Sequence, residues 1–452
     1  AVRAVRHRGV DRIEVAPVVI VCIFHAGGGV VIGRGAREGH VRARAIVVTV
    51  RAGDGTGRRI VVALKRLRRH FAQLAKYCGT GEDIILKIAI LGGGNGCYAA
   101  AADLSANGHE IRFWRRNAVA LRPVAEAGGI ELIDYQGTRD VPVHLTTGDM
   151  AAAVAGADVI LLPIPAIAQP DILAALAPLL TDGQGVLMPP GTFGTVILIR
   201  EMVKTGSAAE IMVGESGTLP YLTRRQGDRS IAIVTRATRL PTGFYPLNRA
   251  DEALALFRQV YPAIEPLTDA LDGALMNAGP VIHPPLIMMN AGPIQHFDHW
   301  DIHNEGTQPA IRAVTDQLDG ERIRVREALG YGAPHFPLAD HYDPDGEEWM
   351  YGNAAHENLV TSEQWREDLD LQHHRYMRED VQCGLAFLVS AGELAGVETP
   401  VASGLLAIAG AVVGEDFRQT GRTLGSLGLG GVKRDALQTA LKNGTLATLM
   451  TG

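Results

Sequence analysis

The first strong pattern in the chain is a buried strand that leads directly into a glycine-rich turn. Residues 83–91 are almost continuously apolar, as in a strand buried on both faces. Glycines dominate 92–96, a stretch of high helix propensity follows at 98–107, and a second strand pattern occupies 109–114. The sequence therefore predicts a strand–turn–helix–strand unit of about 30 residues.

The alternation continues through the first half of the chain. Strand-like apolar segments lie at 156–163, 185–190 and 210–214, with helical segments at 169–180 and 195–204. Strands that alternate with helices favour a parallel sheet with right-handed crossovers. Ligands of such sheets bind beyond the carboxyl ends of the strands.

The second half of the chain has helical patterns instead, of which the clearest are 363–384, 401–416 and 435–442. We therefore predict an α/β Rossmann-like dinucleotide-binding domain over residues 86–268, followed by a mainly α-helical substrate and catalytic domain over residues 269–452. The substrate should bind in the cleft between the two domains.

Composition narrows the class of protein. The chain has 452 residues, of which 47% are hydrophobic, and its net charge of -6 gives no overall attraction to nucleic acid. Its cysteines, Cys22, Cys78, Cys97 and Cys383, show no metal-ligand spacing, so we expect no metal site and a reducing, cytoplasmic environment. The apolar run at 18–24 is far shorter than the roughly 20 residues that span a bilayer, so we expect no membrane segment.

Residues 1–83 differ in charge from the rest of the chain. They contain 16 Lys and Arg against 6 Asp and Glu. Three interpretations remain open: a basic arm for an acidic partner, a targeting segment, or an appendage that is outside the fold and not native. We favour the appendage, because the first strand of a dinucleotide-binding fold begins only near Ile84. We therefore treat residues 1–85 as a basic N-terminal extension, and we expect deletion of 1–83 to leave activity intact.

The glycine turn carries the first chemistry. Gly92 permits the tight turn, and Gly94 lets the backbone approach a pyrophosphate without a β-carbon. The following helix N-terminus offers free N–H groups and a partial positive charge, so we also assign Asn95 and Gly96 to cofactor binding. Cys97 stands where a third glycine is usual. The alternative is a glycine turn in an ordinary βαβ unit.

The end of the second strand predicts which dinucleotide binds. An NAD enzyme usually carries an acid there for the ribose 2′-hydroxyl, whereas this chain has Arg115 and Arg116, which suit a 2′-phosphate. We predict NADP(H), with NAD(H) as the alternative if these arginines are merely a solvated strand end. Segments 163–166 and 189–192 fall at later strand ends, so Pro165 is a candidate contact on the nicotinamide side. Alternatively, these prolines only punctuate turns.

The helical half holds the candidate catalytic groups. His283 lies in an apolar, proline-bounded segment, and an imidazole suits proton transfer near neutral pH. About 90 residues later come Arg375, Glu379 and Asp380 on one predicted helix. One acid and one guanidinium directed into a cleft would orient the histidine and bind a carboxylate. The alternatives are a structural histidine and a solvated charged helix face.

Taken together, four blocks of the chain resemble the octopine/nopaline (opine) dehydrogenase family over about residues 86–452. The blocks are residues 91–96, 214–221, 277–284 and 375–380. The resemblance implies reductive condensation of an amino acid amine with a 2-oxo acid such as pyruvate. By position it makes His283 the catalytic base and Asp380 its partner.

The resemblance also implies which residues bind the two small-molecule substrates. Arg375 would bind the oxo-acid carboxylate and Glu215, with Ser216 beside it, the amino acid; Asn277 joins them as a substrate contact. The chain departs from the family pattern in its N-terminal 85 residues, at Cys97, and at Gly191, where relatives can carry a polar substrate-contacting side chain.

Two other functions remain open. One is an NADPH-dependent 2-oxo acid or ketone reductase of similar layout that needs no amine. The other is a non-catalytic NADP(H)-binding sensor, against which the combination of His283, Asp380 and Arg375 argues. A homodimer is also an open alternative, and the sequence identifies neither the amino acid nor the oxo acid.

Overall fold

The structure, a computed structural model, describes residues 84–450 and, before them, the backbone of six strands. The chain divides into two compact units, Ala1–Ile84 and Ile85–Gly452. In the first unit the described strands pair antiparallel: β1 (Val2–His7) with β2 (Val10–Val15), β3 (Cys22–Phe24) with β4 (Val30–Ile32), and β5 (Ala45–Arg51) with β6 (Gly57–Ala63). Most of the predicted N-terminal extension lies outside the described residues, so its character stays a prediction.

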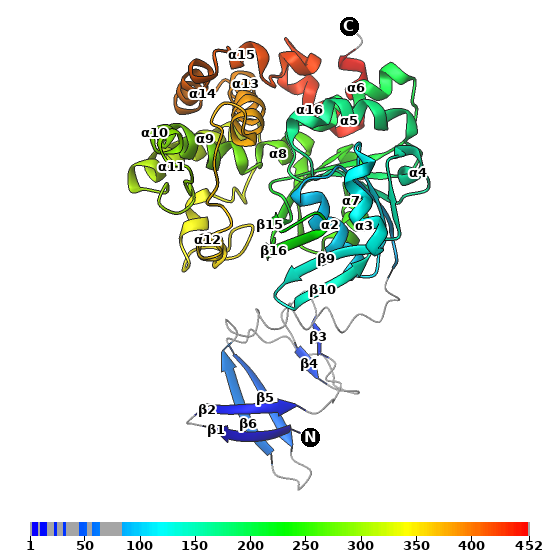
Figure 1. The fold of residues 1–452 in the computed structure, drawn as a ribbon, viewed down its shortest axis with the longest axis vertical. Helices are drawn as coiled ribbons and strands as arrows, with labels where there is room; N and C mark the ends of the chain where they lie inside the picture. Colours follow the sequence, from blue (N-terminus) through cyan, green and yellow to red (C-terminus); the bar gives the residue numbers. More distant parts are fainter. Residues whose placement is uncertain are drawn as a thin grey trace. The chain divides into compact units, whose positions relative to one another are not determined.

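An eight-stranded sheet is the centre of the second unit (Figure 1). Its order is β11-β8-β7-β12-β13-β14-β17-β18, and every neighbouring pair is parallel except β14 with β17. The strands are β7 (Lys87–Leu91), β8 (Glu110–Trp114), β11 (Leu145–Thr147), β12 (Val159–Leu161), β13 (Gly185–Met188), β14 (Met212–Ser216), β17 (Leu240–Tyr245) and β18 (Ile264–Asp269). The strand order reverses between β7 and β12, which is where a ligand crevice is expected in such a sheet.

Helices connect these strands, and a smaller sheet packs beside them. The helices are α2 (Asn95–Ala106), α3 (Arg122–Ala127), α4 (Met150–Val154), α5 (Gln169–Leu176), α6 (Gly194–Thr205) and α7 (Ala250–Val260). The second sheet, which the sequence pattern does not predict, has the order β10-β9-β16-β15, with β9 (Gly129–Asp134), β10 (Gly137–Pro142), β15 (Tyr221–Arg225) and β16 (Ser230–Arg236). Helix α2 contacts strands of both sheets, so it is buried from Gly96 to Leu104.

The remainder of this unit is helical, and in Figure 1 these helices lie mainly to the left of the large sheet. They are α8 (Ala270–Leu275), α9 (Gly279–Met289), α10 (Ala291–His296), α11 (Pro309–Ala328), α12 (Ala355–Thr361), η6 (Tyr376–Leu385), α13 (Ala386–Ala395), α14 (Pro400–Val413), α15 (Phe417–Thr420) and α16 (Arg434–Asn443). The predicted fold class, a Rossmann-like domain followed by a helical domain, is thus confirmed. The last strand ends at Asp269, one residue beyond the predicted boundary.

The helix predicted over residues 363–384 begins later than expected, so that prediction is wrong in its first half. The helix proper is η6, a π-helix that starts at Tyr376. The Asp370 carboxylate accepts hydrogen bonds from the backbone N–H groups of Gln372 and His373. A side chain that captures these N–H groups competes with helical hydrogen bonding, and Glu363 has a left-handed φ of 54°.

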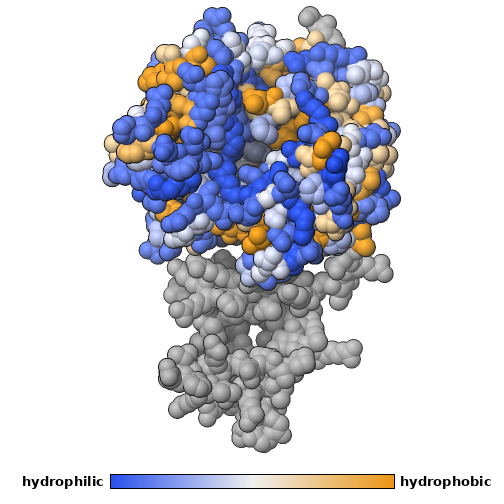
Figure 2. Space-filling model, in the orientation of Figure 1, coloured by the Kyte–Doolittle hydropathy of each residue, from blue (hydrophilic) through white to orange (hydrophobic). Residues whose placement is uncertain are grey.

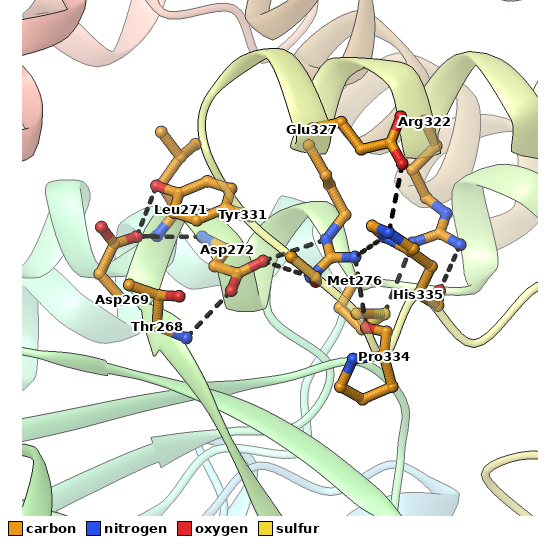
Figure 3. A network of polar contacts seen from close by, with 12 residues as sticks. Thr268, Asp269, Leu271, Asp272, Met276, Arg322, Glu327, Tyr331, Pro334 and His335 are labelled. Atoms are coloured by element: carbon orange, nitrogen blue, oxygen red, sulfur yellow. Dashed lines mark hydrogen bonds and ion pairs between the residues drawn. The ribbon is translucent and has the colours of Figure 1, made fainter.

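A buried polar network ties the end of the large sheet to the helices (Figure 3). Arg326 on α11 donates two hydrogen bonds, 3.0 and 2.7 Å long, to one carboxylate oxygen of Asp272 on α8. Tyr331 donates a 2.8 Å hydrogen bond to Asp269, which also caps the N-terminus of α8. Removing one partner of a fully buried ion pair costs about 3–5 kcal/mol. The network therefore fixes α8, and with it the chain that leads into His283.

The surface of this unit is mostly hydrophilic on the face shown in Figure 2, with hydrophobic residues gathered over α14, where Ile408 is exposed. Within residues 84–450 no single helix is long and apolar enough to cross a membrane, although Pro400–Val413 and Phe417–Leu429 reach that length as a pair bent by 101°. The same part of the chain contains no cluster of three or more His, Cys, Asp or Glu side chains arranged to hold a metal ion.

Candidate active site

A cavity of about 360 Å³ lies where the loops after β7 and β12 meet α9 and η6. We call it the central cavity. Eight of the predicted site residues line it: Gly94, Asn95, Gly96, Pro165, Asn277, His283, Arg375 and Asp380. The other five do not: Gly92, Arg115, Arg116, Glu215 and Ser216. The cavity thus joins the glycine turn to the predicted catalytic pair at the point where the strand order reverses.

The glycine turn forms one end of the central cavity. Gly92 has a φ of +131°, and a β-carbon there would overlap with Ile164 and Cys97. Gly94 is the N-cap of α2, and the position of its missing β-carbon is open space. The first N–H groups of a helix lack partners within the helix, so they can bind an anion that enters this space. The turn therefore fits the pyrophosphate of a dinucleotide.

Cys97, at the third position of the motif, packs the helix against the sheet. Its thiol is completely buried and lies 3.4 Å from the carbonyl oxygen of Pro163. Burial raises the pKa of this thiol to about 12, so it stays protonated at neutral pH. The cysteine thus occupies the place of the third glycine without adding charge near the phosphates.

The two arginines after β8 lie in different surroundings. A β-carbon on Gly93 would overlap with the side chain of Arg115, so this arginine lies across the glycine turn. Arg116 is exposed instead and pairs with Asp171 at 3.4 Å. An exposed ion pair of this kind contributes little to the stability of the fold. Arg115 is therefore the better placed of the two for a phosphate near the turn.

His283 and Asp380 meet at the other end of the cavity. His283 Nδ1 lies 2.7 Å from Asp380 Oδ2, although 97 residues separate them in the chain. Two glycines allow α9 and η6 to approach this closely: a β-carbon on Gly279 would overlap with Asp380, and one on Gly384 with Pro280. Within residues 84–450 the second ring nitrogen, Nε2, forms no hydrogen bond, so it is free to exchange a proton.

Burial sets the protonation of this pair. It raises the pKa of Asp380 to about 7, against the opposing charge of Arg375. Burial, followed by the charges of Arg375 and Arg224, lowers the pKa of His283 well below its usual value. Two groups joined by one short hydrogen bond titrate as a unit. The pair therefore exchanges a proton near neutrality, as acid–base catalysis requires.

Arg375 and Tyr376 complete this end of the cavity. Arg375 is exposed and, among the described residues, forms no hydrogen bond or ion pair; its guanidinium lies 4.7 Å from the centre of the Tyr376 ring. Tyr376 stacks on His283, with ring centres 4.0 Å apart, and its buried hydroxyl has no hydrogen-bond partner within residues 84–450. A free guanidinium beside an unpaired hydroxyl suits a carboxylate ligand.

Two further residues line the cavity that the sequence pattern does not predict, Tyr376 and a second histidine, His303. The buried His303 ring packs edge-to-face with the His283 ring, with 5.6 Å between ring centres. Tyr376 directly follows the predicted Arg375 in the chain, so its position next to a predicted site residue could have indicated it. His303 has no such signal, because only the tertiary fold brings it to the cavity.

Glu215 and Ser216 lie outside the central cavity. Both carboxylate oxygens of Glu215 are engaged at the start of α6: Oε2 accepts from Phe193 N at 2.6 Å, and Oε1 accepts from Thr195 N at 2.8 Å and from the Thr195 hydroxyl. Ser216 donates to the carbonyl of Thr218. A β-carbon on Gly191 would overlap with Glu215. The departure from the family at Gly191 is therefore linked to this position of Glu215, and neither Glu215 nor Ser216 is part of the lining of the central cavity.

Asn277 lines the cavity and is held in place by two contacts. Its amide donates to the Thr192 hydroxyl at 3.1 Å, and its carbonyl oxygen accepts from Gly279 N at 3.0 Å. Asn277 thus connects the loop after β13 to the start of α9, which carries His283.

Comparison with known proteins places this chain in a family. The family model described as NAD/NADP octopine/nopaline dehydrogenase, alpha-helical domain, matches residues 266–413, and that of the NAD-dependent glycerol-3-phosphate dehydrogenase N-terminus matches residues 87–198. The chain is 30% identical to the protein ocs of Agrobacterium vitis over 369 residues, which cover 78% of this chain and 99% of that protein. The chain belongs to the octopine/nopaline dehydrogenase family.

Other members of the octopine/nopaline dehydrogenase family agree with this assignment. The chain is 28% identical to an opine dehydrogenase of Arthrobacter sp. (strain 1C) over 78% of this chain and 98% of that protein. Its fold resembles that of an octopine dehydrogenase solved with NADH and agmatine, with a TM-score of 0.59 and 20% identity over 81% of this chain and 98% of that chain. The predicted family, its NAD(P) dependence and the two-domain fold are confirmed.

Proposed function

We propose that the chain is an NADPH-dependent opine dehydrogenase, which reductively condenses an amino acid with a 2-oxo acid and catalyses the reverse oxidation. The observation that carries this proposal is the hydrogen bond between His283 and Asp380 in the same cavity as the glycine turn. The free guanidinium of Arg375 adds a binding site for the oxo-acid carboxylate.

The residues of the chain supply the acid–base chemistry. Arg375 binds the oxo-acid carboxylate and so orients the carbonyl group. His283 accepts a proton from the substrate ammonium, and the free amine adds to the carbonyl carbon to form a carbinolamine. His283 then donates that proton to the carbinolamine hydroxyl; the C–O bond breaks, water leaves and a C=N bond forms. Positioned acid–base groups of this kind contribute about 10²–10⁴-fold to a rate.

Asp380 acts through His283. Its hydrogen bond to Nδ1 fixes the tautomer that leaves Nε2 available, and its charge stabilises the imidazolium that forms during the reaction. Asn277 holds the start of α9 against the loop after β13, which positions His283.

The cofactor would be held by Gly94, Asn95 and Gly96 at the N-terminus of α2, with Pro165 on the nicotinamide side. When bound, the reduced nicotinamide supplies the hydride for the C=N carbon. Arg115, which lies across the turn, favours the additional phosphate of NADP(H) over NAD(H).

The test is NADPH oxidation with pyruvate alone and with pyruvate plus a panel of amino acids, with product masses measured. The proposal expects oxidation that requires both substrates and a product with the mass of the secondary amine. Oxidation with pyruvate alone at an undiminished rate would identify a simple reductase. Cofactor binding without turnover on any pair would identify a sensor.

The cytoplasmic location and the homodimer remain predictions. Cell fractionation and the mass of the purified chain in solution test them.

A further inference from the structure

One wall of the central cavity consists of a single stretch of chain. His341, Trp349, Tyr351, Leu359 and Trp365 all lie within residues 338–365, and all five are buried. We call these five residues the aromatic wall. The remainder of the lining comes mainly from the glycine turn, from the loops after the strands, and from α9 and η6. No step of the proposed chemistry uses the aromatic wall.

The aromatic wall carries no acid, although the segment that forms it is rich in acids. Residues 338–365 contain seven Asp and Glu residues, and none of them lines the cavity. The acids that do line it are Glu379 and Asp380, both on η6. Asp380 is bonded to His283, and Glu379 accepts a hydrogen bond from Ala166 N beside the loop after β12. The aromatic wall therefore offers no counter-charge to a cationic side chain.

His341 is neutral at physiological pH. Burial, reinforced by the charges of His356 and Arg312, lowers the pKa of this imidazole to about 3. Its Nδ1 is buried and has no hydrogen-bond partner within residues 84–450. A neutral imidazole nitrogen can be satisfied by a neutral polar group of a ligand and requires no charge from it.

Two aromatic rings at or next to the aromatic wall are stacked against arginine side chains. The guanidinium of Arg224 lies 5.0 Å from the centre of the Trp365 ring, and that of Arg312 lies 4.4 Å from the ring of Tyr342, which contacts His341. Arg224 is further bound to Glu367 and to the Gln364 carbonyl, so it is not free to pair with an acidic ligand. At the Trp365 end of the wall, Arg224 therefore repels a further cation without offering a free site for an anion.

We propose that the aromatic wall receives the side chain of the amino acid substrate and selects a neutral side chain, apolar or aromatic, over a cationic or acidic one. This inference rests on the proposed function, because it requires that an amino acid is a substrate. Burying an unpaired charge against this wall is unfavourable in free energy. This penalty is larger than the favourable free energy of burying a hydrocarbon of similar size.

The first test is kcat/KM for L-leucine, L-phenylalanine and L-methionine against L-arginine, L-lysine and L-glutamate, with saturating pyruvate and NADPH. We expect the best neutral amino acid to exceed each charged one by at least about tenfold. A charged amino acid as the best substrate would overturn the inference and leave the proposed function intact. Absence of a secondary-amine product with any amino acid would instead overturn the proposed function.

A second test places an acid in the aromatic wall. In Leu359→Glu the ratio of kcat/KM for L-arginine to that for L-leucine should rise at least about tenfold. Leu359→Gln controls for size. Asn358→Asp, on the same helix but exposed and outside the cavity, controls for charge. The ratio in Leu359→Glu should exceed that in Leu359→Gln at least about tenfold, and Asn358→Asp should keep the ratio of the unmodified chain.

An unchanged ratio in a folded Leu359→Glu protein, judged by near-UV circular dichroism against Leu359→Gln, would show that the side chain binds elsewhere. If Leu359→Glu does not fold, His341→Glu places the acid in the same wall, and the same ratio decides the question.

Discussion

The two ends of the central cavity are built in different ways. The glycine turn uses six consecutive residues, 92–97, and binds through backbone geometry at the start of α2. The His283–Asp380 pair joins residues 97 positions apart, and it exists only because α9 and η6 pack closely at Gly279 and Gly384. Changes at one end should therefore affect the cofactor alone, and changes at the other end the reaction alone.

The largest expected effect comes from His283→Ala. Loss of the group that moves the protons should lower kcat about 10²–10⁴-fold, while the Kd for NADPH, measured by fluorescence, stays the same. His373→Ala is the matched control, because that histidine is exposed, pairs with Asp370 as its one side-chain partner among residues 84–450, and does not line the cavity. An unchanged kcat in His283→Ala would remove the catalytic role from this end of the cavity.

Arg375→Ala should act on the oxo acid. Loss of charge-assisted hydrogen bonds to a carboxylate corresponds to roughly a 10–100-fold increase in KM for pyruvate, with a smaller change in KM for NADPH. Arg378→Ala, three residues away, controls for charge, since Arg378 pairs with Glu415 outside the cavity. Equal effects of the two substitutions would contradict a specific carboxylate site at Arg375.

Arg115→Ala tests the cofactor end. Because Arg115 lies across the glycine turn, its loss should raise KM for NADPH about tenfold and leave KM for NADH nearly unchanged. Arg116→Ala should change both values less, since Arg116 is exposed and paired with Asp171. A preference of the unmodified chain for NADH would overturn the NADP(H) assignment.

The pH dependence gives the smallest effect, and it belongs to the catalytic end. A carboxyl whose pKa is raised to about 7 loses its charge as the pH falls through that value. Condensation begins with an unprotonated pair, because His283 must first accept a proton from the substrate ammonium. Its kcat/KM should therefore fall below about pH 7, by a few-fold near the midpoint. Asp380→Asn should abolish this break, and a kcat/KM for condensation that stays unchanged from about pH 8 to about pH 6 would contradict it.

The same contrast explains what the sequence could predict. The cofactor end follows from local patterns: the apolar run before Gly92, the helix after it, and strands β12, β13 and β14 all lie where the periodicity indicates. The late start of η6 could not be predicted, because the Asp370 side chain captures backbone N–H groups that a helix would use.

The residue types at the catalytic end suggest candidates, but only the family resemblance pairs His283 with Asp380. The structure shows three contacts that the sequence pattern does not predict. Tyr376 stacks on the imidazole of His283, His303 lies beside it, and Glu215 is bound at the start of α6 instead of lining the cavity. Each of these contacts depends on how distant elements pack. The close approach at Gly279 and Gly384 is visible in the sequence only as two glycines.

The most direct test of the account is to follow the hydride. NADPH deuterated at the transferable C4 position is mixed with pyruvate and the best amino acid of the panel, and the product is analysed by mass spectrometry. We expect one deuterium on the former carbonyl carbon of pyruvate, which is now bonded to the amino-acid nitrogen. Deuterium in 2-hydroxypropanoate, with no labelled secondary amine, would show that the hydride reduces pyruvate itself. That result would contradict the claim that the hydride is transferred to the carbon of a C=N bond.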